Sequence, residues 1–379
     1  MRDYCMLCSC ELSAPVESLY AFPSVTSDCR FWSSGRSVVF CNQCGLIKRR
    51  VLDSKKLIFG SVYDEYSMFS HSLVVSDQSV FDESGLAIGR TRIIADFARD
   101  IIDQMPRTIL DIGSGNGAGL VALAEVFSES LVFGCEPNDV AERSSLYFPK
   151  NVMSVNREYP EKRPAYDLVT LFHVLEHVED LLSLLKYISD VLLPGGKLLI
   201  QVPLADKSPF DFVIADHVWH FTESSMANLL RVAGYRVVYL GNDVLEKELT
   251  VIAVPCLIGQ EMDITSNGVT NFVVNETSHF LQSYKSCLDA FLSLGGGGFV
   301  YGTGPSSAFV GAILGDLVEA YIDDDVLRIG GSFCSKKIVG VGNLGDGKPV
   351  FLPFPDYQIK AIMERNPELN VVDFRLAHF

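Results

Sequence analysis

The sequence is poor in basic residues. Its 379 residues include 31 Lys and Arg against 47 Asp and Glu, so the formal net charge is −16 and the pI is near 4.8. Proteins that bind nucleic acids do so largely through Lys and Arg that displace phosphate counterions. The shortage of these residues argues against DNA or bulk RNA as a partner.

Long apolar runs are missing as well. No uncharged apolar stretch reaches the ~18 residues of a membrane span, and the first residues lack the apolar region of a secretory signal. We therefore expect a cytoplasmic protein whose ten cysteines are reduced thiols or metal ligands. The apolar content of 48% is enough to fill the cores of two or three ordinary domains.

Four cysteines form two pairs near the N-terminus, Cys5-x-x-Cys8 and Cys41-x-x-Cys44. Such pairs supply the four sulfur ligands of a closed, tetrahedral zinc site, which is structural. Redox chemistry at Cys-x-x-Cys needs one pair at a helix start in a βαβ unit, a setting that is missing here. The spacing predicts a small zinc module, and a redox role or a module without metal are the alternatives.

Residues 108–256 alternate short β-branched runs with helical patterns, which predicts a mainly parallel sheet flanked by helices. The last two runs, 235–240 and 248–254, are expected to form an antiparallel hairpin at the sheet edge. An amphipathic helix to about Leu294 then precedes a second βαβ start. The fold class is α/β, and the expected parts are a zinc-binding module (1–70), a Rossmann-like core (71–256) and a smaller Rossmann-like domain (257–379).

A glycine-rich turn, from Asp111 to Gly117, follows the first strand of the core. Glycines between a strand and a helix let backbone N–H groups approach a ligand at the positive end of the helix. Glu136, at the end of the next strand, is suitably placed to bind a ribose diol. The turn alone fits a dinucleotide equally well, and a turn kept only for helix packing is the non-functional alternative.

Histidines occur in two motifs. His173-Val-Leu-Glu-His177 matches an inverted zinc-protease motif with two imidazoles on one helical face, but a catalytic zinc needs a third protein ligand and an open position. The loop after Pro203 contains Asp216-His217-x-x-His220-Phe221, and a histidine is well suited to take a proton near neutral pH. We expect a catalytic base in this loop; the alternative is a surface loop that only covers the sheet end.

Five ordered motifs resemble the class I S-adenosylmethionine-dependent methyltransferases. They are the turn at 111–117, Gly-Cys-Glu-Pro at 134–137, Tyr-Asp-Leu-Val at 166–169, Phe-His-Val-Leu-Glu-His at 172–177 and Leu-Leu-Pro-Gly-Gly-Lys at 192–197. The resemblance implies S-adenosylmethionine with its methionine part over the turn, its ribose on Glu136 and its adenine near Glu158. The cofactor residues that it implies are Asp111, Gly113, Ser114, Gly115, Gly117, Glu136, Pro137, Glu158, Phe172 and His173.

The order of cysteine module, methyltransferase core and C-terminal α/β unit resembles the sugar C-methyltransferases that act on nucleotide-activated keto-deoxysugars. This resemblance covers nearly the whole chain and implies His217 as the base, with Asp216 as its acidic neighbour. It also implies that His220, Tyr63 or Tyr66 contacts the substrate. The sequence departs from the family pattern before Asp216, where Ile214 and Ala215 replace the usual Tyr-His, and the C-terminal turn lacks the usual Lys.

We therefore expect an enzyme of deoxysugar biosynthesis that C-methylates a nucleotide-linked 4-keto sugar through an enolate. O-methylation of a hydroxyl is the alternative within the same class. A nicotinamide-binding oxidoreductase is an alternative of another class, because Gly302-x-Gly304-x-x-Ser307 and Asp323 approach dinucleotide spacing. A zinc-ribbon adaptor with an inactive core would bind no S-adenosylmethionine.

Overall fold

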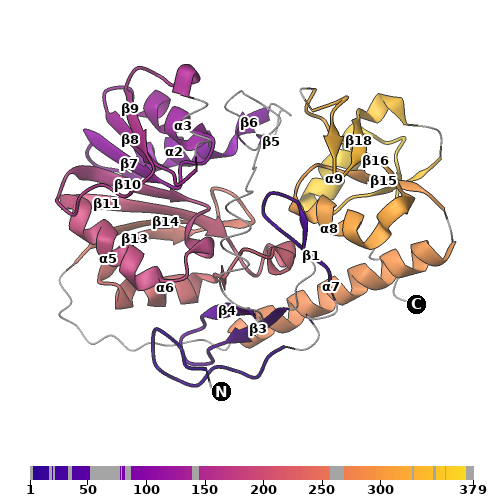
Figure 1. Ribbon diagram of the computed structural model, residues 1–379, viewed down its shortest axis with the longest axis horizontal. Helices are drawn as coiled ribbons and strands as arrows, with labels where there is room; N and C mark the ends of the chain where they lie inside the picture. Colours follow the sequence, from indigo (N-terminus) through magenta and orange to yellow (C-terminus); the bar gives the residue numbers. More distant parts are fainter. Residues whose placement is uncertain are drawn as a thin grey trace.

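A computed structural model shows a central α/β domain, a smaller C-terminal α/β domain and an N-terminal module between them (Figure 1). The described residues are 3–16, 19, 22–32, 36–51, 77, 79–81, 87–138, 145–256, 269–294, 296–326, 328–344, 347–354 and 356–372. The predicted substrate residues Tyr63 and Tyr66 lie outside them.

The central domain is built on a seven-stranded sheet in the order β13-β14-β11-β10-β7-β8-β9. Strand β14 is antiparallel to both neighbours, and the other pairs are parallel. The strand order reverses between β10 and β7, and ligands of open α/β sheets bind beyond the carboxyl ends of strands at such a point. The strands are β7 (Thr108–Ile112), β8 (Leu131–Cys135), β9 (Val152–Asn156), β10 (Tyr166–Phe172), β11 (Leu192–Pro203), β13 (Tyr235–Gly241) and β14 (Glu248–Pro255).

Helices cover both faces of this sheet. The apolar residues of α2 and α3 pack on one face, and those of α5 and α6 pack on the other. Local capping fixes two of the helix starts, since Asp180 accepts from the Ser183 N–H and Thr222 forms a reciprocal capping box with Ser225. The helices are α2 (Arg90–Ile101), α3 (Ala118–Val126), α5 (Leu181–Val191) and α6 (Glu223–Val232), with the short 3-10 helices η2 (Ser145–Tyr147), η3 (Leu175–His177) and η4 (Pro209–Val213).

The predicted hairpin is confirmed, because β13 and β14 pair antiparallel. Strand β13 forms the edge, and β14 inserts between β13 and β11. This insertion places the first residue of β14, Glu248, beside Pro203 at the carboxyl end of β11. Glu248 thereby reaches the edge of the sheet where ligands are expected.

The N-terminal module is joined to the central domain through a shared sheet in the order β12-β4-β3. The short strand β12 (Trp219–His220) comes from the histidine loop and pairs with Lys48 and Ile47. The module therefore supports this loop directly. Its strands are β1 (Ser24–Val25), β2 (Phe31–Trp32), β3 (Arg36–Phe40) and β4 (Ile47–Val51), and β5 (Ser79–Phe81) with β6 (Ala87–Gly89) forms a further hairpin.

The C-terminal domain follows the long helix α7 (Val269–Leu294), which runs from beside the module to the far domain (Figure 1). Its sheet has the order β17-β18-β16-β15-β19-β20, with β17 antiparallel. The predicted boundaries at 70 and 256 stay predictions. The elements are β15 (Gly298–Tyr301), α8 (Pro305–Leu314), η5 (Gly315–Leu317), β16 (Val318–Ile322), β17 (Ser332–Phe333), β18 (Lys336–Val339), η6 (Val341–Asn343), β19 (Pro349–Phe351), α9 (Asp356–Arg365) and β20 (Asn370–Val371).

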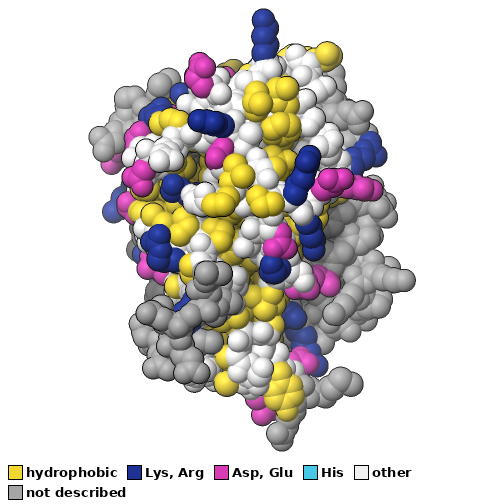
Figure 2. Space-filling view, turned by 90° about the vertical axis from the view of Figure 1, so that its left-hand side faces the viewer, with side chains coloured by type: hydrophobic (Ala, Val, Ile, Leu, Met, Phe, Trp, Pro, Cys, Tyr) yellow, Lys and Arg dark blue, Asp and Glu magenta, His cyan; other side chains and the backbone are white. Residues whose placement is uncertain are grey.

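The outer face of the central domain mixes side-chain types. In the part of that face that is coloured in Figure 2, basic side chains are scattered among acidic and apolar ones. Within the ranges given above, every helix is too short or too polar to span a bilayer.

Candidate active site

The glycine turn connects β7 to α3, and three of its glycines have positive φ angles: 75° at Gly113, 51° at Gly115 and 88° at Gly117. A Cβ atom at Gly113 would lie 2.4 Å from Val174, and one at Gly117 would lie 2.4 Å from the Phe148 ring. At Gly115, by contrast, no described residue has an atom within 4 Å of the added Cβ. Two glycines are therefore required by packing, and the third borders open space that a ligand can enter.

Glu136 lies directly after β8 and holds the turn from the side. One carboxylate oxygen accepts from the Gly115 N–H at 2.9 Å, and the other accepts from the Asn138 N–H at 3.2 Å. Burial raises the pKa of Glu136, and these backbone donors offset the rise in part. Each oxygen keeps further lone pairs, so the carboxylate can also accept from the two hydroxyls of a ribose.

Asp111 is buried inside the sheet beneath the turn. Thr170 donates to its Oδ1 at 2.6 Å, and the Ser114 hydroxyl donates to its backbone oxygen at 3.0 Å. Burial raises the pKa of Asp111 to about 7, against the effect of Thr170. Asp111 and Ser114 thus fix the end of β7 and the first bend of the turn. Of the other cofactor residues expected from the sequence, Pro137 follows Glu136, Phe172 ends β10 close to Gly119, and Glu158 is exposed after β9.

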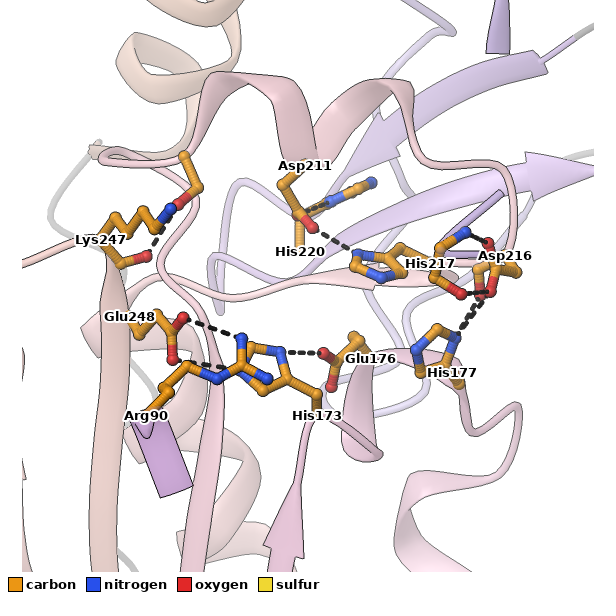
Figure 3. A network of polar contacts seen from close by, with 12 residues as sticks. Arg90, His173, Glu176, His177, Asp211, Asp216, His217, His220, Lys247 and Glu248 are labelled. Atoms are coloured by element: carbon orange, nitrogen blue, oxygen red, sulfur yellow. Dashed lines mark hydrogen bonds and ion pairs between the residues drawn. The ribbon is translucent and has the colours of Figure 1, made fainter. Parts of the chain in front are cut away.

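His173 follows β10 with a φ angle of 55°, in the left-handed region. Its Nδ1 lies 3.1 Å from Glu176 and its Nε2 lies 3.1 Å from Glu248, which Arg90 contacts at 3.2 Å (Figure 3). Burial and Arg90 oppose a charge on this ring, but the two carboxylates outweigh them and raise the pKa of His173. His173 therefore belongs to a buried ion network.

The helix expected from the inverted protease motif does not form. Strand β10 extends through Phe172, the left-handed His173 redirects the chain, and only the 3-10 turn η3 follows. The two imidazoles consequently have different partners, because His177 donates from Nδ1 to the backbone oxygen of Asp216 at 3.1 Å. This geometry removes the pair of ligands on one helical face that the protease interpretation needs.

Asp211 binds both histidines of the loop, His217 through Oδ1 and His220 through Oδ2 (Figure 3). Both contacts use Nδ1 of the imidazole, so each ring carries its proton on that nitrogen when neutral. Burial opposes the charge on His217, but Asp211 outweighs it and raises the pKa of His217. The carboxyl of Asp211, although buried, has its pKa held well below the usual range by the two histidines.

The carboxylate that contacts His217 is thus Asp211, not its sequence neighbour Asp216. Asp216 is fully buried and accepts from the backbone N–H of Ser27 at 2.8 Å and from the Ser27 hydroxyl. Asp216 lies in a turn, and its carboxylate is directed to Ser27 of the N-terminal module. Asp211 was missed from the sequence, although Ser208 followed by Pro209 indicates the short helix start that positions it.

The two histidines of the loop are both buried but have different ring neighbours. His220 is fully buried and its ring stacks on Phe212, with centroids 4.2 Å apart. The His217 ring meets the His177 ring edge to face at 4.6 Å, and that side of His217 is turned away from Asp211. His217 thus contacts the segment that follows β10, whereas His220 packs on Phe212 and holds the other oxygen of Asp211.

The four predicted metal-ligating cysteines come together. Sγ of Cys5 lies 3.3 Å from that of Cys44, Sγ of Cys8 lies 3.4 Å from that of Cys41, and all four sulfurs are within 4.8 Å of one another. A tetrahedral zinc with bonds near 2.3 Å needs sulfurs just under about 4 Å apart, so this donor set fits zinc. The cluster would fix the module that pairs with β12.

The module also contacts the histidine loop through Arg49. This buried guanidinium donates to the backbone oxygens of His217 at 3.1 Å and Phe212 at 3.2 Å. Burial lowers the pKa of Arg49 to about 10, against the attraction of Asp216 and Asp211, so it stays charged at neutral pH. Arg49 therefore ties the module to both ends of the segment that holds the Asp211–His217 pair.

Comparison with known proteins gives the class of the central domain. A family model described as a methyltransferase domain matches residues 88–240. That segment holds the glycine turn, Glu136 and His217, so the central domain is of the methyltransferase class.

The individual relatives are similar over the same region. Methyltransferase str2 of Strobilurus tenacellus is 33% identical over 100 residues, which are 25% of this chain and 35% of the relative. The ubiquinone biosynthesis O-methyltransferase of Proteus mirabilis (strain HI4320) is 34% identical over 99 residues, 24% of this chain and 39% of the relative. The chain thus spans less than half the length of these relatives. The solved structure of mitomycin 7-O-methyltransferase MmcR has 20% identity and a TM-score of 0.37, over 44% of this chain and 54% of its own.

Proposed function

We propose that the protein is an S-adenosylmethionine-dependent methyltransferase that acts on a small molecule. The proposal rests on the contacts that join the glycine turn, where the cofactor would bind, to the surroundings of His217, where the acceptor would bind. Val174 packs on Gly113 of the glycine turn, and three residues later His177 contacts both Asp216 and the His217 ring. A cofactor over Gly115 and an acceptor beside His217 would therefore lie at the same edge of the sheet.

The cofactor, when bound, supplies an electrophilic methyl group on a sulfonium. The protein residues must position the acceptor and create the nucleophile. Asp211 holds the His217 proton on Nδ1 and orients the ring, so that the lone pair on Nε2 can take a proton from the acceptor. The arrangement is that of a base and its orienting carboxylate, with both groups buried.

For the acceptor we propose a nucleotide-linked 4-keto-deoxysugar that is methylated on carbon. The proton taken by His217 would come from the carbon next to the ketone. The electron pair of that C–H bond would then form the new bond to the methyl group, while the methyl–sulfur bond would break and its electrons would stay on the departing S-adenosylhomocysteine. This choice is supported by the resemblance to the sugar C-methyltransferases over nearly the whole chain and by the position of His217 as the proposed base. A second candidate is O-methylation of a hydroxyl, which is favoured by the similarity to the ubiquinone biosynthesis O-methyltransferase.

Substitution of the base tests the proposal. We expect His217→Ala to lower methyl transfer by at least about 100-fold and to leave S-adenosylmethionine affinity nearly unchanged, because the His217 ring contacts Asp211 and His177, neither of which belongs to the glycine turn. The substrates are nucleotide-linked 4-keto sugars, and NMR of the product distinguishes C–CH₃ from O–CH₃. His279→Ala, at an exposed position on α7, is the matched control. Full turnover by His217→Ala would reject the base, and an O–CH₃ product would favour the second candidate.

The orienting carboxylate can be tested separately. Asp211→Asn should lower transfer more strongly than Asp216→Asn, because only Asp211 fixes the tautomer of His217. Cofactor titration of both variants checks that the core remains folded. Equal losses of transfer would show that Asp211 has no special role.

We further propose that Cys5, Cys8, Cys41 and Cys44 bind a structural zinc ion. The convergence of four sulfurs supports this assignment. Metal analysis of the purified protein should find about one zinc per chain, and Cys8→Ser should lose it. Cys10→Ser, at an exposed cysteine of the same module, should retain it.

A further inference from the structure

A second group of metal-ligating side chains lies beside the catalytic histidine. Glu176, His177 and His217 each offer one ligand atom, and the three atoms lie within 4.8 Å of one another. We infer that these residues form a binding site for one divalent transition-metal ion, distinct from the cysteine cluster. Two imidazoles and one carboxylate are a donor set that Zn²⁺, Co²⁺ and Ni²⁺ accept, whereas Mg²⁺ and Ca²⁺ prefer oxygen ligands.

Both imidazoles are held in the tautomer that a metal requires. Nδ1 of His177 faces the backbone oxygen of Asp216, and Nδ1 of His217 faces the carboxylate of Asp211. An oxygen acceptor at Nδ1 keeps the proton there and leaves the Nε2 lone pair free. Metal-ligating histidines almost always show this outer hydrogen bond to a carbonyl or carboxylate, which also fixes the ring orientation.

Glu176 provides an independent sign of a missing ligand. Its side chain is fully buried, and its Oε1 interacts with His173 at 3.1 Å. Its other oxygen, Oε2, is buried and has no hydrogen-bond partner among the described residues. A buried, ionised oxygen without a partner is unfavourable, and a bound cation would satisfy it.

The surrounding charges also favour a cation. Asp211, Asp216 and Glu176 lie around the two rings, and Arg49 is the guanidinium on the side of the module (Figure 3 shows the carboxylates). Arg49 attracts Asp216 and Asp211, and Glu176 faces His173 and the two rings, so the three carboxylates outnumber the one arginine. A divalent ion at the three ligand atoms would balance this excess without a proton on His217, and it would keep an open position, since it has three protein ligands.

The consequence for turnover rests on the proposed function. A metal ion at this site uses the same Nε2 lone pair that His217 needs as a base. The ion and the acceptor proton therefore compete for one atom, and a bound ion should inhibit methyl transfer reversibly. Binding itself does not depend on the protein being a methyltransferase.

Cobalt provides a probe that separates the two metal sites. Protein with zinc in the cysteine cluster is titrated with Co²⁺, and we expect about one further equivalent with visible d–d bands but without thiolate-to-cobalt charge transfer. Glu176→Gln should weaken this binding at least about tenfold, whereas Glu179→Gln, at an exposed carboxylate three residues along, should not. Cofactor titration checks that both variants are folded. Absence of the extra equivalent, or equal binding to Glu176→Gln, would overturn the site.

A rate measurement tests the proposed inhibition of methyl transfer separately from metal binding. In the wild-type protein, the midpoint of inhibition by Co²⁺ should match the midpoint of the d–d bands, and removal of Co²⁺ by buffer exchange, with zinc retained in the cysteine cluster, should restore transfer. Rates that stay unchanged or rise while cobalt is bound would overturn the inhibition. If the protein proves to transfer no methyl group, the cobalt titration still decides whether the metal site exists.

Discussion

The chain contains two turns with nearly the same backbone plan but different surroundings. In the central domain, β7 leads through the glycine turn into α3, and Glu136 follows the next strand. In the C-terminal domain, β15 leads through Gly302 and Gly304 into α8, and Asp323 follows the next strand. The first turn leaves open space above Gly115, and the hydrogen bonds that Glu136 accepts from described residues come from the backbone N–H groups of Gly115 and Asn138.

In the second turn, by contrast, the acid is paired by side chains of its own domain, although Gly304, like Gly115, has no described atom within 4 Å of an added Cβ. Thr303 donates to Asp323, Arg328 donates to Thr303 at 2.7 Å, and the Arg328 guanidinium lies 3.7 Å from the Asp323 carboxylate. The acid that would hold a ribose in a nicotinamide-binding domain is thus already paired. The glycine spacing alone does not make a binding site; what matters is whether the acid beside the turn is free to accept from a ligand.

The largest effect should come from removing the zinc proposed for the module, because this would damage the part of the central site around His217 alone. Without zinc, β4 and Arg49 lose their support, and the Asp211–His217 pair loses its position. We expect transfer to fall by about 100-fold or more, while S-adenosylmethionine affinity changes by less than about threefold. The measurements are rates and calorimetric titrations of chelated and zinc-reloaded protein. Full transfer by metal-free protein would show that the module does not position the base.

The acids of the two turns provide the next test. Glu136→Ala should weaken S-adenosylmethionine binding about 10- to 100-fold, because hydrogen bonds to a charged group contribute roughly 1.5–3 kcal/mol and each 1.4 kcal/mol is tenfold in affinity. Asp323→Ala is the matched variant in the C-terminal domain and should leave this affinity unchanged. Calorimetric titration of both variants measures the difference. Equal losses would mean that the two turns are not distinct in function.

The contact between the glycine turn and Glu136 could be predicted from the sequence because its parts are close in the chain. The turn and Glu136 belong to consecutive βα units, and the strand spacing alone places them at one edge of the sheet. The convergence of the four cysteines could be predicted in the same way, since two Cys-x-x-Cys pairs fit tetrahedral coordination of a metal. The same local logic predicted the β13–β14 hairpin.

The surroundings of His217, where the acceptor would bind, could be predicted only in part, because the contacts there join distant segments of the chain. Asp216 binds Ser27, 189 positions away, and Arg49 reaches His217 over 168 positions. The sequence gives no spacing rule for such contacts, so the orienting role of Asp211 and the convergence of Glu176 on His217 were not foreseen. The left-handed turn at His173 was also unexpected, since this conformation is uncommon for residues other than glycine.

The open space above the central turn can be tested directly. Gly115→Ala places a methyl group where the ligand is expected, at a φ angle of 51° that alanine adopts at a cost of about 1–2 kcal/mol. We expect S-adenosylmethionine affinity to fall about tenfold. Gly304→Ala is the counterpart in the C-terminal domain, where the added Cβ also meets no described atom within 4 Å and the φ angle is −122°. That variant should bind the cofactor normally, and a similar loss would indicate an indirect effect on the fold.

The smallest difference is expected where the two turns are physically alike. Gly117 and Gly302 have φ angles of 88° and 85°, and an added Cβ would lie 2.4 Å from the Phe148 ring or 2.7 Å from the Phe354 ring. Each substitution to alanine should therefore destabilise its own domain by roughly 2–4 kcal/mol, from the left-handed backbone and the overpacking together.

The two losses of stability should agree within about 1 kcal/mol, because in both turns a glycine with a positive φ angle packs against a phenylalanine ring. Hydrogen exchange of the β7 and β15 amides reports the loss in each domain. Gly195→Ala provides the baseline, since its φ angle is 83° and no described atom lies within 4 Å of the added Cβ, so only the backbone term of about 1–2 kcal/mol applies. A large loss of stability on Gly117→Ala with a negligible loss on Gly302→Ala would contradict this prediction. It would mean that the two turns differ in backbone packing as well as in the side chains that surround their acids.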